Sequence, residues 1–356
     1  MERKQIRYLG CAALVLASGL AGVPSAHAAT AHAATAHVVF PGESIQKAVD
    51  AAQAGDIIFI APGTYHESVL VTKSGLSIRG SGKWTVLKPD ATETDSCAAA
   101  GNGICVQGTS ARPVTGTSIR SLTLTGYKKN GLWASNTDGL TVRRVSSEEN
   151  GNWGFAEERS VRSVFEDNAA RDNGESGLFL SNTVATEAGA TDAHGTVARR
   201  NTLTGNRIGI TVRRLQNVTV EDNYLAGNCA GVFVVGDENK PRTGAITVRG
   251  NRVQENNKYC PKTARLPFIQ GAGIVLTGVE NTVVEYNDVR DNVGTSPFSG
   301  GVVLYKSMVG TPNDRNVIRD NALTGNSTAD LANRDTGKGN KFDHNTCRRS
   351  EPAGMC

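Results

Sequence analysis

Aromatic and charged side chains recur at fixed distances after a series of glycines along the chain. An aromatic residue stands two positions after the glycine at Trp133, Phe179 and Phe233. In three other coils the residue four positions after the glycine is Glu158, Arg213 or Tyr305, which supply a carboxylate, a guanidinium and a phenol. Aromatic rings offer flat apolar surfaces to the C–H faces of sugar rings, and the other three groups can bind an acid or move a proton. Whether these groups form one site depends on whether the fold places them on one face.

The glycines belong to a repeat that is clearest in residues 201–235. Gly209 and Gly231 each open a short apolar run and lie 22 residues apart, with the alternating run Val218-Thr219-Val220 between them. This period is too short for a βαβ unit, and its glycine, asparagine and β-branched residues are atypical of a helical repeat. It fits one coil of a parallel β-helix, with three short strands and three turns. Asparagines at two turns of most coils are predicted to stack and hydrogen-bond along the solenoid.

The chain ends predict a leader, a cap and a tail around this solenoid. Residues 1–29 have a basic start, an apolar run and a small-residue cleavage site, as in a secretory signal peptide. Residues 30–42 are predicted as a flexible lead-in. Residues 44–53 have a helical apolar pattern and would cap the open end of a β-helix spanning 43–346. Residues 347–356 would form a disulfide-linked tail, and the product would be a secreted, extracellular protein.

Six cysteines remain after the leader, and an even number in a secreted chain indicates disulfides. Spacing favours the sequential pairs Cys97–Cys105, Cys229–Cys260 and Cys347–Cys356 among the fifteen pairings that six cysteines allow. No CxxC pair occurs, which argues against a cysteine-rich zinc site.

Charge and composition limit the partners. The formal net charge of +4 falls to +2 once the three basic and one acidic side chains of residues 1–29 are removed. Because the net charge is close to zero and no block of basic residues occurs, the chain is a poor candidate for binding nucleic acid or an anionic membrane. We expect a monomer with a polysaccharide partner.

The opening of the solenoid is more specific than its repeats. A capping helix followed by GDIIFIAPGTYHESV and LSIRG resembles the start of the pectate-lyase-like superfamily of right-handed parallel β-helix proteins. The resemblance covers roughly residues 40–345 and implies an all-β, single-domain right-handed parallel β-helix with an N-terminal capping helix. The superfamily includes pectate lyases, polygalacturonases, alginate lyases, mannuronan epimerases and non-hydrolytic metal-centre maturation proteins, so it defines the fold better than the activity.

The resemblance also implies where a ligand would lie, along the sheet of the Gly-led strands. Strand alternation then directs the aromatic and charged rows outward, with Glu158 and Arg213 about 9–10 Å apart. We predict catalytic roles for Arg213, Glu158, Tyr305 and Lys306, and substrate binding by Trp133, Phe179, Phe233, Arg214 and Asp237. The alternative is that the aromatics pack beneath long loops and the charges are solvated.

Motifs of individual families are incomplete. Asn136-Thr137-Asp138 matches the first polygalacturonase motif, but Glu157-Glu158 replaces its aspartate pair, and the GHG, RIK and epimerase DPH segments are absent. Since the hydrolase carboxylates are missing, β-elimination or epimerisation of an acidic polysaccharide is favoured. A non-catalytic module that binds polysaccharide or protein is the alternative, and a periplasmic metal-handling protein is a third class.

Acidic residues concentrate on three adjacent coils. Oxygen ligands of this kind can bind Ca²⁺, and we name Glu157, Glu158 and Asp167 as candidate calcium ligands. Solvated turn carboxylates are the alternative. The scattered histidines His66, His194 and His344 support neither a metal cluster nor a Ser-His-Asp triad.

Overall fold

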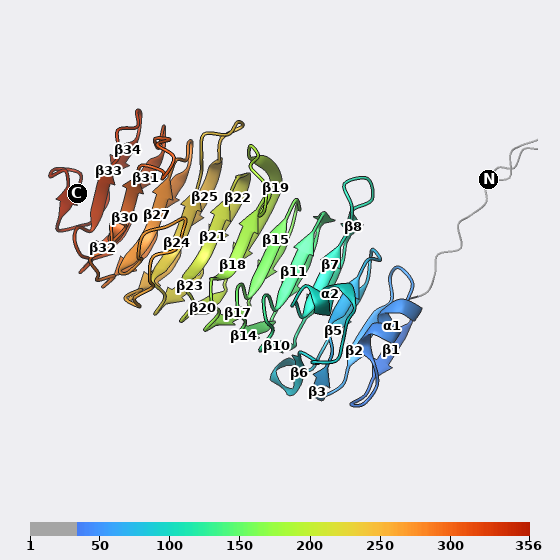
Figure 1. Cartoon of the computed structure of the whole chain (residues 1–356). Helices are drawn as coiled ribbons and strands as arrows, with labels where there is room; N and C mark the ends of the chain where they lie inside the picture. The colour runs from blue at the N-terminus through green and yellow to red at the C-terminus, as the bar shows by residue number, and fades with distance from the viewer. Residues whose placement is uncertain (1–33) are drawn as a thin grey trace, which may run out of the picture. The chain divides into compact units, whose positions relative to one another are not determined.

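The computed structural model describes residues 34–356, and the predicted leader lies outside this range. The chain winds repeatedly through three parallel sheets, which we call A, B and C, and each strand pairs with its equivalents in the coils before and after it (Figure 1). The predicted parallel β-helix is therefore confirmed. None of the helices in residues 34–356 is both long and apolar enough to span a membrane.

Sheet A has twelve strands, one from nearly every coil. They are β1 (Ala36–Val39), β2 (Ile57–Ile60), β5 (Ser77–Arg79), β9 (Ser118–Arg120), β13 (Thr141–Arg143), β16 (Val164–Glu166), β19 (Thr191–Arg199), β22 (Leu215–Glu221), β25 (Gly244–Arg249), β28 (Val283–Glu285), β31 (Val317–Arg319) and β34 (Lys341–Asp343).

Sheet B follows sheet A in each coil and has ten short strands. They are β3 (Gly63–His66), β6 (Thr85–Lys88), β10 (Thr123–Thr125), β14 (Ser146–Glu148), β17 (Ala169–Arg171), β20 (Thr202–Thr204), β23 (Tyr224–Ala226), β26 (Arg252–Gln254), β29 (Asp288–Arg290) and β32 (Ala322–Thr324).

Sheet C contains the Gly-led strands and has eleven members. They are β4 (Val69–Val71), β7 (Ile104–Gln107), β11 (Leu132–Ser135), β15 (Phe155–Glu158), β18 (Ser176–Ser181), β21 (Ile208–Arg213), β24 (Ala230–Val235), β27 (Ala272–Thr277), β30 (Gly300–Tyr305), β33 (Leu331–Arg334) and β35 (Ser350–Glu351). A separate pair, β8 (Val114–Thr115) with β12 (Thr137–Asp138), lies outside the three sheets.

The core is a continuous column of aliphatic side chains from all three sheets. Two buried asparagine ladders run beside it, as predicted. In one, side-chain amides join Asn150 through successive coils to Asn326 at 2.8–3.2 Å. The second runs from Asn168 to Asn345. At this second turn the left-handed residue is the one before the asparagine, as at Asp167 and Asp222, so the amide and not the backbone is what selects asparagine here.

The N-terminal end is closed by α1 (Ile45–Ala51), which buries Ile45 and Val49. Ser44 caps the helix, and the Glu67 carboxylate accepts hydrogen bonds from the Ile45 and Gln46 N–H groups at 2.6 and 3.2 Å. A carboxylate at a helix N-terminus satisfies donors that have no partner inside the helix. The two other helices are short, α2 (Ser96–Ala99) and the 3₁₀ turn η1 (Gly82–Trp84).

Two predicted boundaries were wrong. Residues 36–39 are not a flexible lead-in, because β1 pairs with β2 and extends sheet A. The C-terminal tail is not separate from the β-helix either, since β35 pairs with β33. In both places the added strand becomes the edge strand of its sheet.

Candidate functional site

The three predicted disulfide pairs are present, Cys97–Cys105, Cys229–Cys260 and Cys347–Cys356. Disulfides persist in oxidising compartments. The middle pair does more than link coils. Cys260 lies in the loop 257–271, so the disulfide fastens that loop where β24 begins.

An aromatic platform lies on the outer face of sheet C. Trp133 on β11 and Phe179 on β18 point outward, with Ala156 of β15 in register between them. The small Ala156 side chain leaves room for the ring of Trp153, which comes from the turn before β15. Trp153 is stacked on both neighbours, with centroids 6.1 Å from Trp133 and 4.5 Å from Phe179. Phe179 is 7% exposed, so the two half-buried indoles form the accessible surface.

Trp153 was missed by the sequence analysis. It immediately precedes Gly154, a position that in other coils holds asparagine, serine, alanine or another small or aliphatic residue. A tryptophan there breaks the pattern of the repeat, and that departure was the available signal.

A polar row lies beside the platform, formed in register by Ser135, Glu158, Ser181 and Arg213. We call the outward surface of β11, β15, β18 and β21, together with Trp153, the C face. Glu158 and Arg213 are two strands apart, about 9–10 Å at ordinary strand spacing. Glu158 pairs with Arg159 and accepts a hydrogen bond from the Val184 N–H at 3.2 Å.

Arg213 is the cation of the C face without an ion-pair partner among the described residues. It is half-buried. Burial first, and then the neighbouring positive charges of Arg214 and Arg265, lower the pKa of Arg213. A guanidinium nevertheless stays charged at neutral pH. A desolvated cation beside other cations gains more from binding an anion than an exposed one does.

Arg214 and Asp237, predicted to bind substrate, instead hold two loops together. The Arg214 side chain is 3% exposed; its Nε lies 2.6 Å from Asp237, and Nη1 donates to the Thr186 carbonyl at 2.7 Å. A further ion pair joins it to Glu187. Since its donors are used within the protein, Arg214 connects the loops 182–190 and 236–243 at the edge of the C face.

Phe233 is not part of an accessible surface. It is fully buried and meets Phe298 edge-on at 5.1 Å, beneath the loops that carry Ile269 and Phe298. Tyr305, half-buried, packs on the other side of Phe298 at 4.9 Å. Tyr305 and the exposed Lys306 lie three strands beyond Arg213, about 14 Å away. The structure therefore groups Arg213 with Glu158 and separates both from Tyr305 and Lys306.

Glu157 points into the core, between Ala134 and Leu180 of the neighbouring strands. Both carboxylate oxygens are buried without a hydrogen-bond partner in the described chain. Burial raises the pKa of Glu157 to about 7. The Ser163 hydroxyl lies near enough to offset part of this effect but forms no well-shaped hydrogen bond.

The predicted calcium ligands do not come together. Glu157 and Glu158 are on opposite faces of β15, and Asp167 is at a turn between sheets A and B. There Asp167 pairs with Arg143 at 3.2 Å and Arg200 at 2.9 Å. Within residues 34–356 no three acidic, histidine or cysteine side chains are placed to hold a metal ion. The calcium prediction is wrong for these residues.

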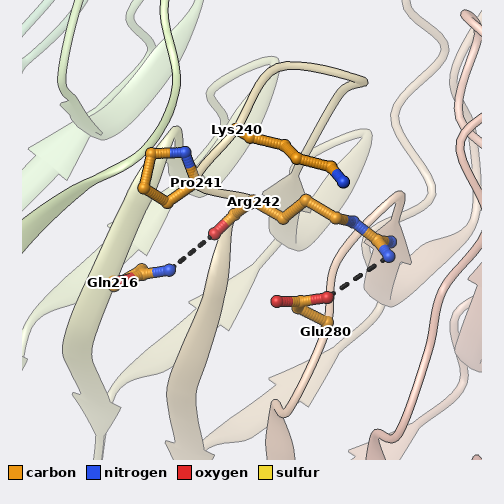
Figure 2. Close-up of a pocket in the computed structure, with 5 residues that line it drawn as sticks. All are labelled: Gln216, Lys240, Pro241, Arg242 and Glu280. Carbon is orange, nitrogen blue, oxygen red and sulfur yellow. Dashed lines mark hydrogen bonds and ion pairs between the residues drawn. The ribbon is translucent and has the colours of Figure 1, made fainter.

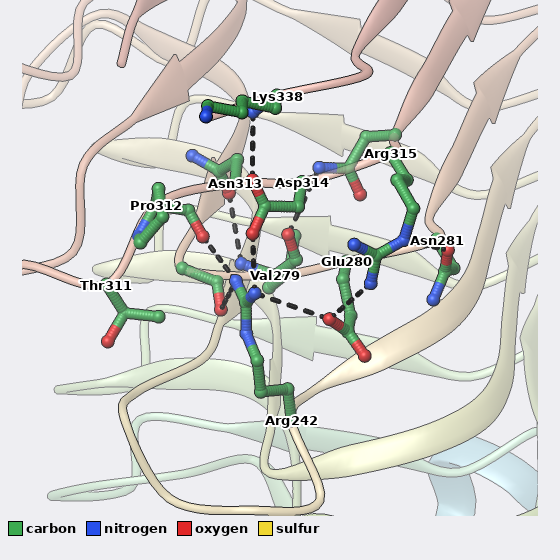
Figure 3. Close-up of polar contacts among 12 residues, drawn as sticks. Arg242, Val279, Glu280, Asn281, Thr311, Pro312, Asn313, Asp314, Arg315 and Lys338 are labelled. Carbon is green, nitrogen blue, oxygen red and sulfur yellow. Dashed lines mark hydrogen bonds and ion pairs between the residues drawn. The ribbon is translucent and has the colours of Figure 1, made fainter. Parts of the chain in front are cut away.

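Surface depressions lie elsewhere. One of them, of about 330 Å³, lies at the edge where the chain passes from sheet C to sheet A. Figure 2 shows the residues that line it, Gln216, Lys240, Pro241, Arg242 and Glu280. Its floor is a charged network (Figure 3), in which Arg242 lies 2.7 Å from Asp314 and 3.3 Å from Glu280. Burial opposes ionisation of Asp314, but hydrogen bonds from the Lys338 N–H and Arg242 outweigh it and lower the pKa of Asp314. The network joins three consecutive turns.

Comparisons with known proteins agree on the fold. Residues 74–243 match the family described as a right-handed β-helix region, and residues 182–351 match the one described as periplasmic copper-binding protein (NosD). No curated protein matches the sequence.

Solved structures extend the likeness over most of the chain. The A-module of Azotobacter vinelandii mannuronan C-5 epimerase AlgE6 is 18% identical with a TM-score of 0.57, over 86% of this chain and 89% of that one. The periplasmic alginate epimerase AlgG is 14% identical with a TM-score of 0.59, over 83% and 69%. The Dettilon tailspike protein is 12% identical with a TM-score of 0.55, over 88% and 67%. The protein is a right-handed parallel β-helix, as its opening residues indicated.

The residues present do not fit a copper centre. The segment that matches the copper-binding description holds two histidines, His194 and His344, and one methionine, Met308. His194 lies on β19 and His344 directly follows β34, and these two strands of sheet A are five strand spacings apart, roughly 24 Å. Thiolate, thioether or imidazole ligands must converge on copper, and these do not.

Proposed function

We propose that the C face binds an acidic polysaccharide and acts on its uronate residues by β-elimination or epimerisation. The observation that carries the proposal is the stacked pair Trp133 and Trp153 on the same face as Arg213, which is half-buried and has no ion-pair partner among the described residues. Indole faces suit the apolar faces of pyranose rings, and the guanidinium suits a carboxylate. Structural likeness to alginate epimerases agrees with the substrate class.

The chemistry starts with removal of the proton on the carbon next to the uronate carboxylate. Negative charge then spreads onto the carboxylate oxygens, where Arg213 would stabilise it. Glu158, the carboxylate in the outward rows of the C face, is our candidate to take or return the proton. Return of a proton from the opposite face gives the epimer, whereas loss of the glycosidic oxygen at the next carbon gives an unsaturated chain end.

The proposal is tested in deuterated water. The mature protein is incubated with pectate, alginate and glycosaminoglycans, and products are followed by ultraviolet absorbance for unsaturated ends and by NMR for solvent deuterium at C5. Deuterium at C5 without unsaturation indicates epimerisation. Unsaturated ends without deuterium at C5 indicate elimination, because that carbon carries no hydrogen in the unsaturated product. The proposal fails if no substrate gains deuterium, no unsaturated ends form and no polysaccharide gel retains the protein.

Binding without turnover is the second candidate. It is favoured by the contacts of Glu158, whose carboxylate already forms an ion pair with Arg159 and accepts a hydrogen bond from the Val184 N–H. In that case the gel retains the protein, retention depends on Trp133 and Trp153, and the polysaccharide is recovered unchanged. Secretion to the cell exterior, which both candidates assume, is tested by detecting the protein in culture medium.

A further inference from the structure

The outer face of sheet A carries a single row of charged side chains at one register position. From β13 to β34 their signs alternate: Arg143, Glu166, Arg199, Glu221, Arg249, Glu285, Arg319 and Asp343. Neighbours form ion pairs, for example Arg249 with Glu221 at 2.5 Å and Arg319 with Glu285 at 2.6 Å. Opposite charges directly across a strand pair are stabilising, and like charges are not.

The alternation fails at the N-terminal end of the row. Arg79 on β5, Arg120 on β9 and Arg143 on β13 are consecutive at the same register. At strand spacing their Cα atoms are about 4.8 Å apart. Arg144 follows Arg143 in the chain. Like charges at this separation repel, so the sequence here departs from the arrangement that stabilises the rest of the row.

These arginines line a depression of about 120 Å³, together with Ser121. No carboxylate lines it. Within residues 34–356, neither Arg79 nor Arg144 forms an ion pair or a side-chain hydrogen bond. Arg120 donates to the Ser118 hydroxyl at 3.0 and 2.8 Å. Arg143 alone reaches carboxylates, Asp167 at 3.2 Å and Glu166 at 3.6 Å.

The depression suits one small oxyanion. A volume of about 120 Å³ leaves room for an ion of that size. Each guanidinium presents donors in a planar fork that matches two oxygens of a sulfate or phosphate group. Most of those donors on Arg79, Arg120 and Arg144 have no protein acceptor. An anion would also remove the repulsion between the stacked arginines.

We propose that Arg79, Arg120, Arg143 and Arg144 form a binding site for a tetrahedral oxyanion, sulfate or phosphate, on the outer face of sheet A. The site is separate from the C face, which lies on another sheet, and does not depend on the function proposed for that face. The anion is either free in solution or an ester group on a polymer.

The test measures sulfate binding calorimetrically, with sodium chloride at matched ionic strength as the reference. We expect saturable sulfate binding that weakens at least tenfold in Arg120→Gln and in Arg79→Gln. Arg249→Gln, in the alternating part of the same row, is the matched control and should bind as the wild type does. Unchanged affinity in both variants, or equal loss in the control, overturns the proposal.

Dextran sulfate beside inorganic sulfate separates the two sources of the anion. Tighter binding of the polymer, lost in Arg79→Gln, assigns the site to an ester group. Equal binding per sulfate assigns it to the free ion. Binding of neither probe contradicts the proposal, provided that thermal unfolding shows the protein to be folded.

Discussion

Replacing Glu157 should change how the stability of the β-helix depends on pH. This carboxyl is 1% exposed, faces the core and has no hydrogen-bond partner in the described chain. Burial raises its pKa from 4.5 to about 7. At 1.36 kcal/mol for each pKa unit, this shift corresponds to about 3 kcal/mol.

The direction in which the free energy of unfolding changes with pH follows from whether the folded or the unfolded chain releases the proton first. Below pH 4.5 the carboxyl is protonated in both states, and no stability is lost. Between pH 4.5 and 7 the unfolded chain releases the proton while the folded chain keeps it, so the free energy of unfolding falls as pH rises. Above pH 7 both states are ionised, and the full loss of about 3 kcal/mol remains.

Glu157→Gln cannot ionise and should lack this loss. We expect urea unfolding to show similar stability for the variant and the wild type at pH 4, and a growing advantage for the variant that reaches about 3 kcal/mol by pH 8. Glu157→Leu should gain at least as much, since it also removes buried polar atoms without partners. Glu149→Gln, on an exposed turn, is the control and should follow the wild type. A difference between Glu157→Gln and wild type that stays constant from pH 4 to 8 would refute the reasoning.

Four further outcomes are expected. Trp153→Ala should weaken retention on a polyuronate gel about fivefold, because a stacked aromatic contact contributes roughly 1 kcal/mol. Arg213→Gln should lower affinity or turnover about 50-fold, as expected for a lost charge-assisted contact, and retention equal to wild type would contradict its role. Arg242→Ala should lower unfolding stability by about 1–3 kcal/mol, measured by thermal unfolding, because Asp314 and Glu280 each lose one partner. Reducing Cys229–Cys260 should make the loop 257–271 the first site of limited proteolysis, and cleavage elsewhere first would argue against its fastening role.

The repeat period predicted the parallel β-helix and the direction of most strand side chains, and the resemblance of the opening residues added the handedness. The same alternation that directs Glu158 outward requires Glu157 to face the core, yet its charge led us to name it a calcium ligand together with Glu158. Carboxyl groups are usually exposed, and a buried one is an exception. The residue type was therefore a poor guide to the position of Glu157, and the strand alternation was the correct one.

The site was harder to predict than the fold, because the paths of the loops that cover its side chains are not periodic. Phe233 occupies the same register as Trp133, but the loop 257–271, fastened through Cys260, covers it. The sequence shows that a loop is long and that it carries a cysteine, but not the direction in which the loop folds. Arg214 directly follows β21, and the loop acceptors Asp237, Glu187 and the Thr186 carbonyl, which the repeat does not reveal, are what separate its role from that of Arg213.

Tryptophan fluorescence tests the central claim most directly. The chain has three tryptophans, and Trp84→Phe leaves only Trp133 and Trp153, both on the C face. Titrating this variant with an oligouronate should produce a saturable change in emission, which Arg213→Gln shifts to at least tenfold higher concentration. No change on adding an oligouronate that a gel assay shows to be bound, or a change that Arg213→Gln leaves unaltered, would contradict binding at the C face.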